Sequence, residues 1–126
     1  MKKIFFLMIV FLFSLAGSSQ TSLVDSKWKP QTDAPRILLD FKKDTLSILF
    51  TSGREPEVMI FSQHHDSLQI KKVSGTGACA IGTEGWYRIE WFSNGDQFLL
   101  RNINDDCNGR AAAFTANRFE RMIKVN

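Results

Sequence analysis

The side chains best suited to metal binding or acid–base chemistry are the two histidines. His64 and His65 are adjacent, and Asp66 follows them. Neighbouring side chains of a strand point to opposite faces, so the two imidazoles can share one metal ion only in a turn. A zinc site takes three or four protein ligands, and this segment supplies too few. We therefore interpret residues 64–66 as a surface turn and predict neither a metal site nor a cofactor.

A second segment with candidate ligands, residues 104–108, gathers oxygen-bearing side chains around a cysteine. Its sequence, Asn-Asp-Asp-Cys-Asn, lacks the regular Asp-x-Asp-x-Asp spacing and the distal Glu of a calcium loop. We interpret it as a turn in which Asp105 and Asp106 accept hydrogen bonds from backbone amides. Asp106 is also expected to form a local ion pair with Arg110. A weak cation site is the alternative interpretation.

The residue sets that would indicate an enzyme are missing from the sequence. The Gly-rich residues 74–77 are not followed by the Lys-Ser/Thr pair of a phosphate-binding loop. No Gly-x-Ser-x-Gly motif occurs, and two histidines in one turn are a poor source of a base for a Ser-His-Asp set. Glu90 shares a strand face with Trp86 and Arg88, which is typical of a solvated outer stripe. We therefore predict a non-enzymatic protein.

Aromatic side chains are the best indication of a binding function. The densest group lies in residues 86–92, which contain two Trp, one Tyr and one Phe. Alternation puts Tyr87, Ile89 and Trp91 on one strand face. Trp86 and Phe92 fall on the other face. One set should fill the core, and the other set is then partly exposed. Exposed aromatic side chains are typical of binding surfaces.

The elements that position these residues follow a segment with the pattern of a secretory signal peptide. Two lysines precede an apolar run at residues 4–13, and residues 16–19 are small. The run is shorter than the roughly 20 residues of a membrane-spanning helix, and no Cys follows it that would carry a lipid. Cleavage after Ser18 and cleavage after Ser19 both fit the pattern. We predict a signal peptide at residues 1–19 and export to the periplasm or the exterior.

Removal of this segment changes what the composition implies. The 126 residues contain 16 Lys and Arg against 13 Asp and Glu, a net charge of +3. Without Lys2 and Lys3 the balance is 14 against the same 13, or +1. A near-neutral domain at residues 20–126 has no basic surplus for nucleic-acid binding and no second long apolar run. We expect one domain, a monomer without a membrane span.

Export also determines how Cys79 and Cys107 are interpreted. In a reducing compartment they would be two unrelated thiols, whereas in an oxidising one the two cysteines of a small domain pair. Their midpoint in the sequence falls at residues 93–96, which contain Asn-Gly, the strongest hairpin signal of the chain. We predict a disulfide across the open end of this hairpin. Closing a loop of that length stabilises a fold by about 3–4 kcal/mol.

The rest of the domain consists of short segments with the alternating pattern of β-strands. The predicted strands are residues 23–29, 36–42, 45–51, 57–63, 67–73, 85–92, 96–103 and 118–124. Short links between them favour an antiparallel up-and-down meander, and closure into a barrel removes exposed strand edges. We therefore predict an all-β fold, a small antiparallel barrel of about eight strands. Residues 111–113 are expected to form one helical turn at most.

Two short motifs lie near the ends of the domain. The first, residues 25–28, is Asp-Ser-Lys-Trp, and the second is Asp-Cys-Asn-Gly-Arg at residues 106–110 followed by Arg-Phe-Glu-Arg at residues 118–121. The first resembles the Gly-x-Trp motif on the first strand of the lipocalin-like (calycin) barrels. The second is similar to the Asp-x-Cys-x-Gly-Arg…Trp-x-Arg ending of small bacterial members. Ser26 and Phe119 depart from the Gly and Trp of that pattern.

The resemblance implies structural roles for several of these residues. In calycins a basic residue near the C-terminus packs over the first-strand Trp and closes the floor of the barrel. By resemblance, Arg121 or Arg118 packs on Trp28, a cation–π contact worth about 0.5–2 kcal/mol. Arg110 belongs to the second motif and is also expected to be structural.

The resemblance also implies an exported, lipocalin-like binding domain for a small hydrophobic ligand. We expect this ligand in the barrel mouth, between the loops of Gly53 and Gly75. Its contacts would be four aromatic side chains, Phe41, Phe50, Tyr87 and Trp91.

An alternative function is a protein-interaction module, either an enzyme inhibitor or a component of an envelope assembly. Strands this short enclose little volume once aromatic side chains fill it. A barrel filled by its own side chains would act through its surface, so the volume of the cavity discriminates between the two functions.

Overall fold

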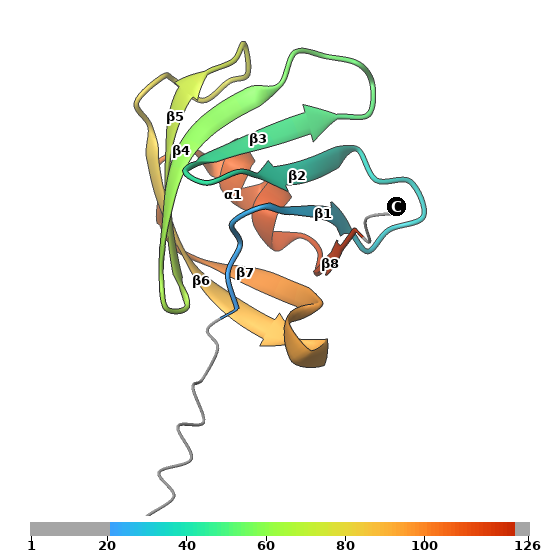
Figure 1. Ribbon diagram of the computed structural model, residues 1–126. Coiled ribbons are helices and arrows are strands. Elements are labelled where there is room, and N and C mark those ends of the chain that lie inside the picture. Colours follow the sequence, from blue (N-terminus) through green and yellow to red (C-terminus); the bar gives the residue numbers. More distant parts are fainter. Residues whose placement is uncertain (1–20, 123–126) are drawn as a thin grey trace, which may run out of the picture.

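Eight strands follow one another around a closed antiparallel barrel in the computed structural model, which describes residues 21–122 (Figure 1). The strands are β1 (Ser26–Pro30), β2 (Ile37–Phe41), β3 (Thr45–Phe50), β4 (Glu57–His64), β5 (Ser67–Ser74), β6 (Glu84–Phe92), β7 (Gln97–Asp105) and β8 (Phe119–Arg121). Each strand pairs with the next, and β1 pairs with β8 to close the barrel. The predicted up-and-down barrel is confirmed. The predicted signal peptide, residues 1–19, lies outside the described residues.

The hairpin of β6 and β7 is built as its turn sequence predicts. The connection is a short 3₁₀ turn, η1 (Ser93–Gly95), in which Asn94 has φ 55° and Gly95 has φ 89°. Asn and Gly adopt this left-handed conformation at the lowest cost. Phe92 pairs with Gln97 beside the turn, and Trp91 pairs with Phe98 one position further along the ladder.

The barrel interior is filled by side chains of the inner strand faces. The fully buried side chains include Trp28, Phe41, Tyr87, Phe98, Phe114, Phe119, Leu23, Leu39, Leu46, Met59 and Leu68. The rings of Trp28 and Phe98 are 4.6 Å apart, and those of Phe98 and Phe119 are 5.2 Å apart. Tyr87 and Ile89 face inward, and Trp86 on the other face is 41% exposed. The middle of the barrel therefore has no room for a ligand of appreciable size.

The first strand begins later than predicted because the chain turns at residues 23–25. Asp25 has φ 57°, and the buried Leu23 is held by a hydrogen bond from its N–H to Oε1 of Gln63 at 2.8 Å. Ser26, which departs from the family pattern, has a role in this turn. Its hydroxyl accepts a hydrogen bond from the indole N–H of Trp28 at 2.6 Å and donates one to the carbonyl of Leu23.

Of the two arginines expected over Trp28, Arg121 takes that position. Its Cζ lies 4.5 Å from the Trp28 ring centroid, and Trp28 pairs with Arg121 in the β1–β8 ladder. Arg118 lies instead over Phe92, at 3.7 Å. The strand that carries Arg121 is shorter than predicted, and residues 123–124 are not among the described residues.

A helix, α1 (Asn108–Thr115), replaces the single helical turn that was expected. The sequence signal is faint because only three side chains of α1, Arg110, Ala111 and Phe114, are buried. The helix packs against β7 and follows directly on Cys107 (Figure 1). Within residues 21–122, no helix has the length and hydropathy that a membrane crossing requires.

Candidate functional site

One end of the barrel contains an apolar cavity of about 260 Å³, here called the mouth cavity. The starts of β2 and β4 and the ends of β3 and β5 meet there, and α1 lies across it. Its lining is formed by Ile37, Ile48, Phe50, Arg54, Glu57, Met59, Lys72, Gly77, Ala78, Cys79, Cys107, Gly109, Arg110, Ala113 and Phe114. A wider outer groove of about 720 Å³ adjoins it and shares Ile37, Phe50, Arg54 and Ala113.

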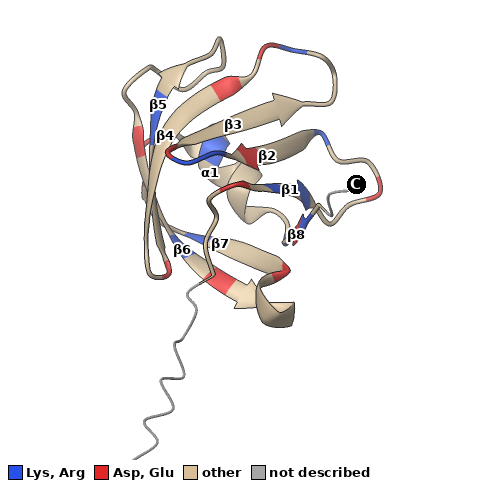
Figure 2. Ribbon diagram, viewed as in Figure 1, with Lys and Arg blue, Asp and Glu red and all other residues tan. Residues whose placement is uncertain are grey.

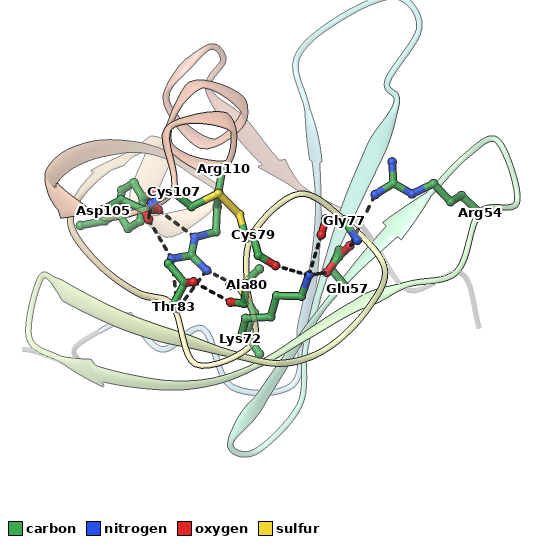
Figure 3. Close-up of a disulfide and its surroundings, with 12 residues drawn as sticks. Arg54, Glu57, Lys72, Gly77, Cys79, Ala80, Thr83, Asp105, Cys107 and Arg110 are labelled. Atoms are coloured by element: carbon green, nitrogen blue, oxygen red, sulfur yellow. Dashed lines mark hydrogen bonds and ion pairs between the residues drawn. A yellow bond between two sulfur atoms is a disulfide. The ribbon is translucent and has the colours of Figure 1, made fainter.

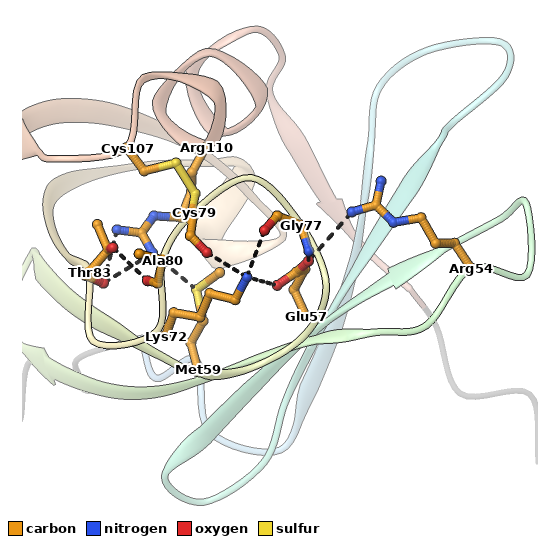
Figure 4. A network of polar contacts seen from close by, with 10 residues as sticks. All are labelled: Arg54, Glu57, Met59, Lys72, Gly77, Cys79, Ala80, Thr83, Cys107 and Arg110. Carbon is orange, nitrogen blue, oxygen red and sulfur yellow. Dashed lines mark hydrogen bonds and ion pairs between the residues drawn. A yellow bond between two sulfur atoms is a disulfide. The ribbon is translucent and has the colours of Figure 1, made fainter.

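The wall of the mouth cavity contains a buried ion pair that sequence reasoning missed. Nζ of Lys72 lies 2.7 Å from Oε2 of Glu57 and also donates to the carbonyl oxygens of Cys79 at 2.7 Å and Gly77 at 3.3 Å (Figure 4). Lys72 is 1% exposed, and Glu57 is 6% exposed. Two of the three donors of the ammonium group reach backbone carbonyls, and its charge is paired with that of Glu57. A signal for this pair was present, because Lys72 follows Leu68 and Ile70 on the inner face of β5.

Glycines allow the loop after β5 to approach the Glu57 carboxylate. The backbone N–H of Gly77 donates to Oε1 of Glu57, and a Cβ atom at Gly75 or Gly77 would collide with that carboxylate. Residues 74–77, whose sequence lacks the motif of a phosphate-binding loop, thus help to bind the carboxylate. Burial alone would raise the pKa of Glu57. Hydrogen bonds from Lys72 and Gly77, together with the nearby positive charges, outweigh burial and lower it.

A second buried network joins α1 to β6 and β7. The guanidinium of Arg110 donates to both carboxylate oxygens of Asp105, each at 2.8 Å, and the Tyr87 hydroxyl donates to the same carboxylate. The ion-pair partner of Arg110 is therefore Asp105, and the prediction of Asp106 is wrong. Asp105 ends β7 with its side chain inward, whereas Asp106 is exposed. Arg110 also donates to the Thr83 carbonyl at 3.3 Å (Figure 3).

The surroundings of this network shift the pKa values of its members. Burial would raise the pKa of Asp105, but hydrogen bonds from Arg110, Tyr87 and the backbone N–H of Cys107 lower it overall. Burial and the hydrogen bond to the Asp105 carboxylate raise the pKa of Tyr87 well above its usual range. Burial would lower the pKa of Arg110, but the partnership with Asp105 raises it. Asp105 and Arg110 are therefore charged and Tyr87 is neutral at physiological pH.

The predicted disulfide, Cys79–Cys107, is confirmed and forms part of the cavity lining (Figure 3). Its Cα atoms are 5.7 Å apart, and it links the loop between β5 and β6 to the start of α1. It therefore fixes the Cys79 carbonyl, which binds Lys72, to the helix that covers the cavity.

The four aromatic residues predicted to contact a ligand are not brought together. Phe50 lines the mouth cavity. Tyr87 is fully buried in the middle of the barrel and Phe41 is buried at the opposite end, 5.0 Å from the ring of Phe61. Trp91 also lies at the opposite end, with its ring 6.1 Å from Trp28. Of the four, only Phe50 is placed where a ligand in the mouth cavity would touch it.

The histidines lie away from the cavity, where His64 ends β4 and His65 begins the turn to β5. Their rings contact each other with centroids 5.0 Å apart, and His65 has φ 54°. Within the part of the chain that the structure describes, no group of three or more His, Cys, Asp or Glu side chains is placed to hold a metal ion.

Comparisons of the chain with protein-family models, with curated proteins and with solved structures find no match. The lipocalin-like resemblance therefore stays a prediction that rests on two short motifs. Because one barrel fold serves many functions, what the mouth cavity binds has to be inferred from its own side chains.

Proposed function

We propose that the protein is an exported, non-enzymatic binding domain that holds a small hydrophobic ligand in the mouth cavity. The observation that carries this proposal is the cavity itself, which is lined mainly by apolar side chains such as Ile48, Met59 and Phe114. It lies beside Arg54 and Gly77, between the two loops where the sequence places a ligand. The disulfide supports export, because disulfides persist in oxidising compartments.

The size of the cavity limits the ligand. Cavities for drug-sized molecules measure about 300–1,000 Å³, and the mouth cavity measures about 260 Å³. The filled core beneath it prevents a longer molecule from entering more deeply. The disulfide and the two buried ion pairs hold the wall in place, so little ordering is needed on binding.

A matched pair of helix variants tests the proposal. Ala113 lines the mouth cavity, and its neighbour Ala112 does not. Both are exposed on α1, so replacing either with Trp should destabilise the helix to a similar extent. Ala113→Trp should fill the entrance with an indole ring and abolish binding of 1-octanol, whereas Ala112→Trp should retain it.

Binding is measured by calorimetry and by methyl NMR shifts of Ile37, Ile48 and Met59. These reporters are needed because none of the three tryptophans, Trp28, Trp86 and Trp91, lines the cavity. Equal binding by the two variants, or methyl shifts confined to other parts of the barrel, would contradict the proposed site.

The second candidate is a protein-interaction module, and two exposed apolar side chains of β6 and β7 favour it. Trp86 is 41% exposed and Ile103 is 62% exposed. Ile103 is next to Asn104, the partner of Trp86 in the ladder. Single exposed apolar residues are common, but a neighbouring pair that includes Trp is typical of interfaces. Inhibition of a lysozyme or a serine protease by the domain, lost in Trp86→Ser, would support this function over ligand binding.

A further inference from the structure

The charges around the mouth cavity are unbalanced. Its lining contains three cationic side chains, Arg54, Lys72 and Arg110, and one anionic side chain, Glu57. Asp105, immediately behind Arg110, balances the charge of that arginine. The remaining groups carry one positive charge more than they carry negative charge. Along the rest of the described chain, basic and acidic positions are interspersed (Figure 2).

Two of the three cations have no capacity left for a ligand. Lys72 is paired in charge with Glu57 and donates hydrogen bonds to two carbonyl oxygens. Arg110 uses its guanidinium on Asp105 and on the Thr83 carbonyl. A ligand could recruit either cation only by displacing a buried partner, which leaves a buried charge unpaired.

Arg54 is different because most of its guanidinium is unused. Among residues 21–122 its polar contact is a single long one, from Nη2 to Oε1 of Glu57 at 3.4 Å. Its side chain is 50% exposed, on the far side of Glu57 from Lys72 (Figure 4). Its Cζ lies 4.2 Å from the Phe50 ring centroid. This contact holds the guanidinium over the apolar rim and leaves donors of its planar fork available.

We propose that the ligand of the mouth cavity is a small amphipathic anion, with its anionic group paired to Arg54 and its apolar body against Phe50, Ile48 and Met59. This inference rests on the proposed function and adds the chemical class of the ligand. A carboxylate suits the fork of a guanidinium, which binds it with two parallel hydrogen bonds. Glu57 does not repel such a group strongly, because Lys72 neutralises it at 2.7 Å.

The test compares molecules that differ in charge but not in apolar body. The probes are octanoate with 1-octanol, and 3-phenylpropanoate with 3-phenyl-1-propanol, titrated calorimetrically at low salt. Each carboxylate should bind about tenfold more tightly than its alcohol, as expected for a charge-assisted pair. Arg54→Gln should remove this advantage by weakening the binding of the carboxylates far more than that of the alcohols.

Arg36→Gln is the matched control. Arg36 is an exposed arginine that lines the outer groove and not the mouth cavity, so its removal should leave the preference for carboxylates intact. Thermal melting of both variants checks that they are folded. Arg54→Lys should restore part of the preference, because it keeps the charge without the fork.

The outcomes separate this inference from the proposed function. If carboxylates and alcohols bind equally, or if Arg54→Gln weakens both alike, the pairing with Arg54 is wrong although the cavity still binds apolar molecules. If no probe of either kind binds, the proposed function and this inference both fail. If the preference for carboxylates disappears in Arg36→Gln and persists in Arg54→Gln, the anion lies in the outer groove and this assignment is overturned.

Discussion

Lys72 and Glu57 form a buried ion pair between neighbouring strands, with Nζ and Oε2 2.7 Å apart. Moving both charges out of water is costly, and their attraction compensates for that cost only while both partners are present. The backbone carbonyls of Gly77 and Cys79 complete the shell of Lys72. The pair therefore ties β4, β5 and the disulfide-bearing loop into one unit at the mouth of the barrel.

Removing one member of this pair should destabilise the fold strongly. Lys72→Met leaves the Glu57 carboxylate buried without its cation, and we expect a loss of about 3–5 kcal/mol. Lys71→Met, at an exposed position one residue earlier, should change stability by about 0.5 kcal/mol or less. Urea unfolding measures both. The double variant Lys72→Met/Glu57→Leu should regain most of the loss, and equal effects of the two single variants would contradict the role of the pair.

The protein should lose stability in acid over a defined range of pH. Glu57 and Asp105 have folded-state pKa values below their ordinary values of 4.5 and 3.8. A carboxyl with a lowered folded-state pKa contributes stability above its unfolded pKa and loses it as the pH falls through the folded value. With respect to these groups, the free energy of unfolding should therefore be nearly constant well above pH 4.5, begin to fall near pH 4.5 as the contribution of Glu57 is lost, and fall more steeply below pH 3.8, where that of Asp105 is lost too. Asp105→Asn should show a shallower decline when urea unfolding is repeated down to about pH 2.

Tyr87 allows a spectroscopic test at the alkaline end, because it is the single tyrosine of the chain. Its folded-state pKa lies above the ordinary value of 10.0, so it contributes stability below pH 10.0 that is lost as the pH rises further. Tyrosinate absorbance should appear only as the barrel unfolds, together with the change in circular dichroism. Tyrosinate forming near pH 10.0 in a protein with a native spectrum would show that Tyr87 is not held by Asp105.

Replacing either cysteine of the disulfide should destabilise the fold by the same amount. Cys79 and Cys107 are 28 residues apart in the sequence, and closing such a loop is worth about 3–4 kcal/mol in the chain-entropy model. Cys79→Ser and Cys107→Ser should lower the melting temperature alike, and a reducing agent should have the same effect on the wild-type protein but none on the variants. Clearly unequal effects of the two substitutions would mean that one cysteine has a role apart from the bond.

Arg121 should contribute more to stability than Arg54. Arg121 lies over the fully buried Trp28 and also donates to the Gly95 carbonyl at 3.4 Å. We expect Arg121→Ala to cost about 0.5–2 kcal/mol. Arg54→Ala should cost less, since the side chain is half exposed and has one long polar contact. Chemical denaturation of the two variants compares them, and a greater loss from Arg54→Ala would overturn the order.

The fold was largely predictable because strand alternation and turn chemistry are local signals. Residues 67–73 alternate cleanly, and Asn94-Gly95 has the sequence of a tight turn. The full length of helix α1 was not predicted because its inward face includes a charged side chain, Arg110. This side chain is buried only through its pairing with Asp105. Such a pairing between a strand end and a helix is a tertiary effect that a single sequence does not reveal.

The candidate site was predicted less well than the fold, for a geometric reason. Alternation tells which face of a strand a side chain occupies, but not its height along the barrel axis. Phe41 and Phe50 both lie on strands that line the barrel, yet they stand at opposite ends of it because one ends β2 and the other ends β3. Alternation puts Lys72 on the inner face of β5 with Leu68 and Ile70, but it does not reveal Glu57 as the partner that neutralises the buried charge.

The pairing of β1 with β8 joins the two ends of the domain and has a consequence for synthesis. Trp28 pairs with Arg121, and Pro30 pairs with Phe119, so the contacts that close the barrel join residues 93 and 89 positions apart (121 − 28 and 119 − 30). A chain that emerges N-terminus first can form the hairpins of β2 to β7, whose contacts are local, but not the barrel. Contacts between residues that are far apart in the sequence, such as those that close the barrel, are slow to form. The sheet therefore stays open between β1 and β7 until β8 is added. A stop codon before residue 119 would leave β1 and β7 as unpaired edges.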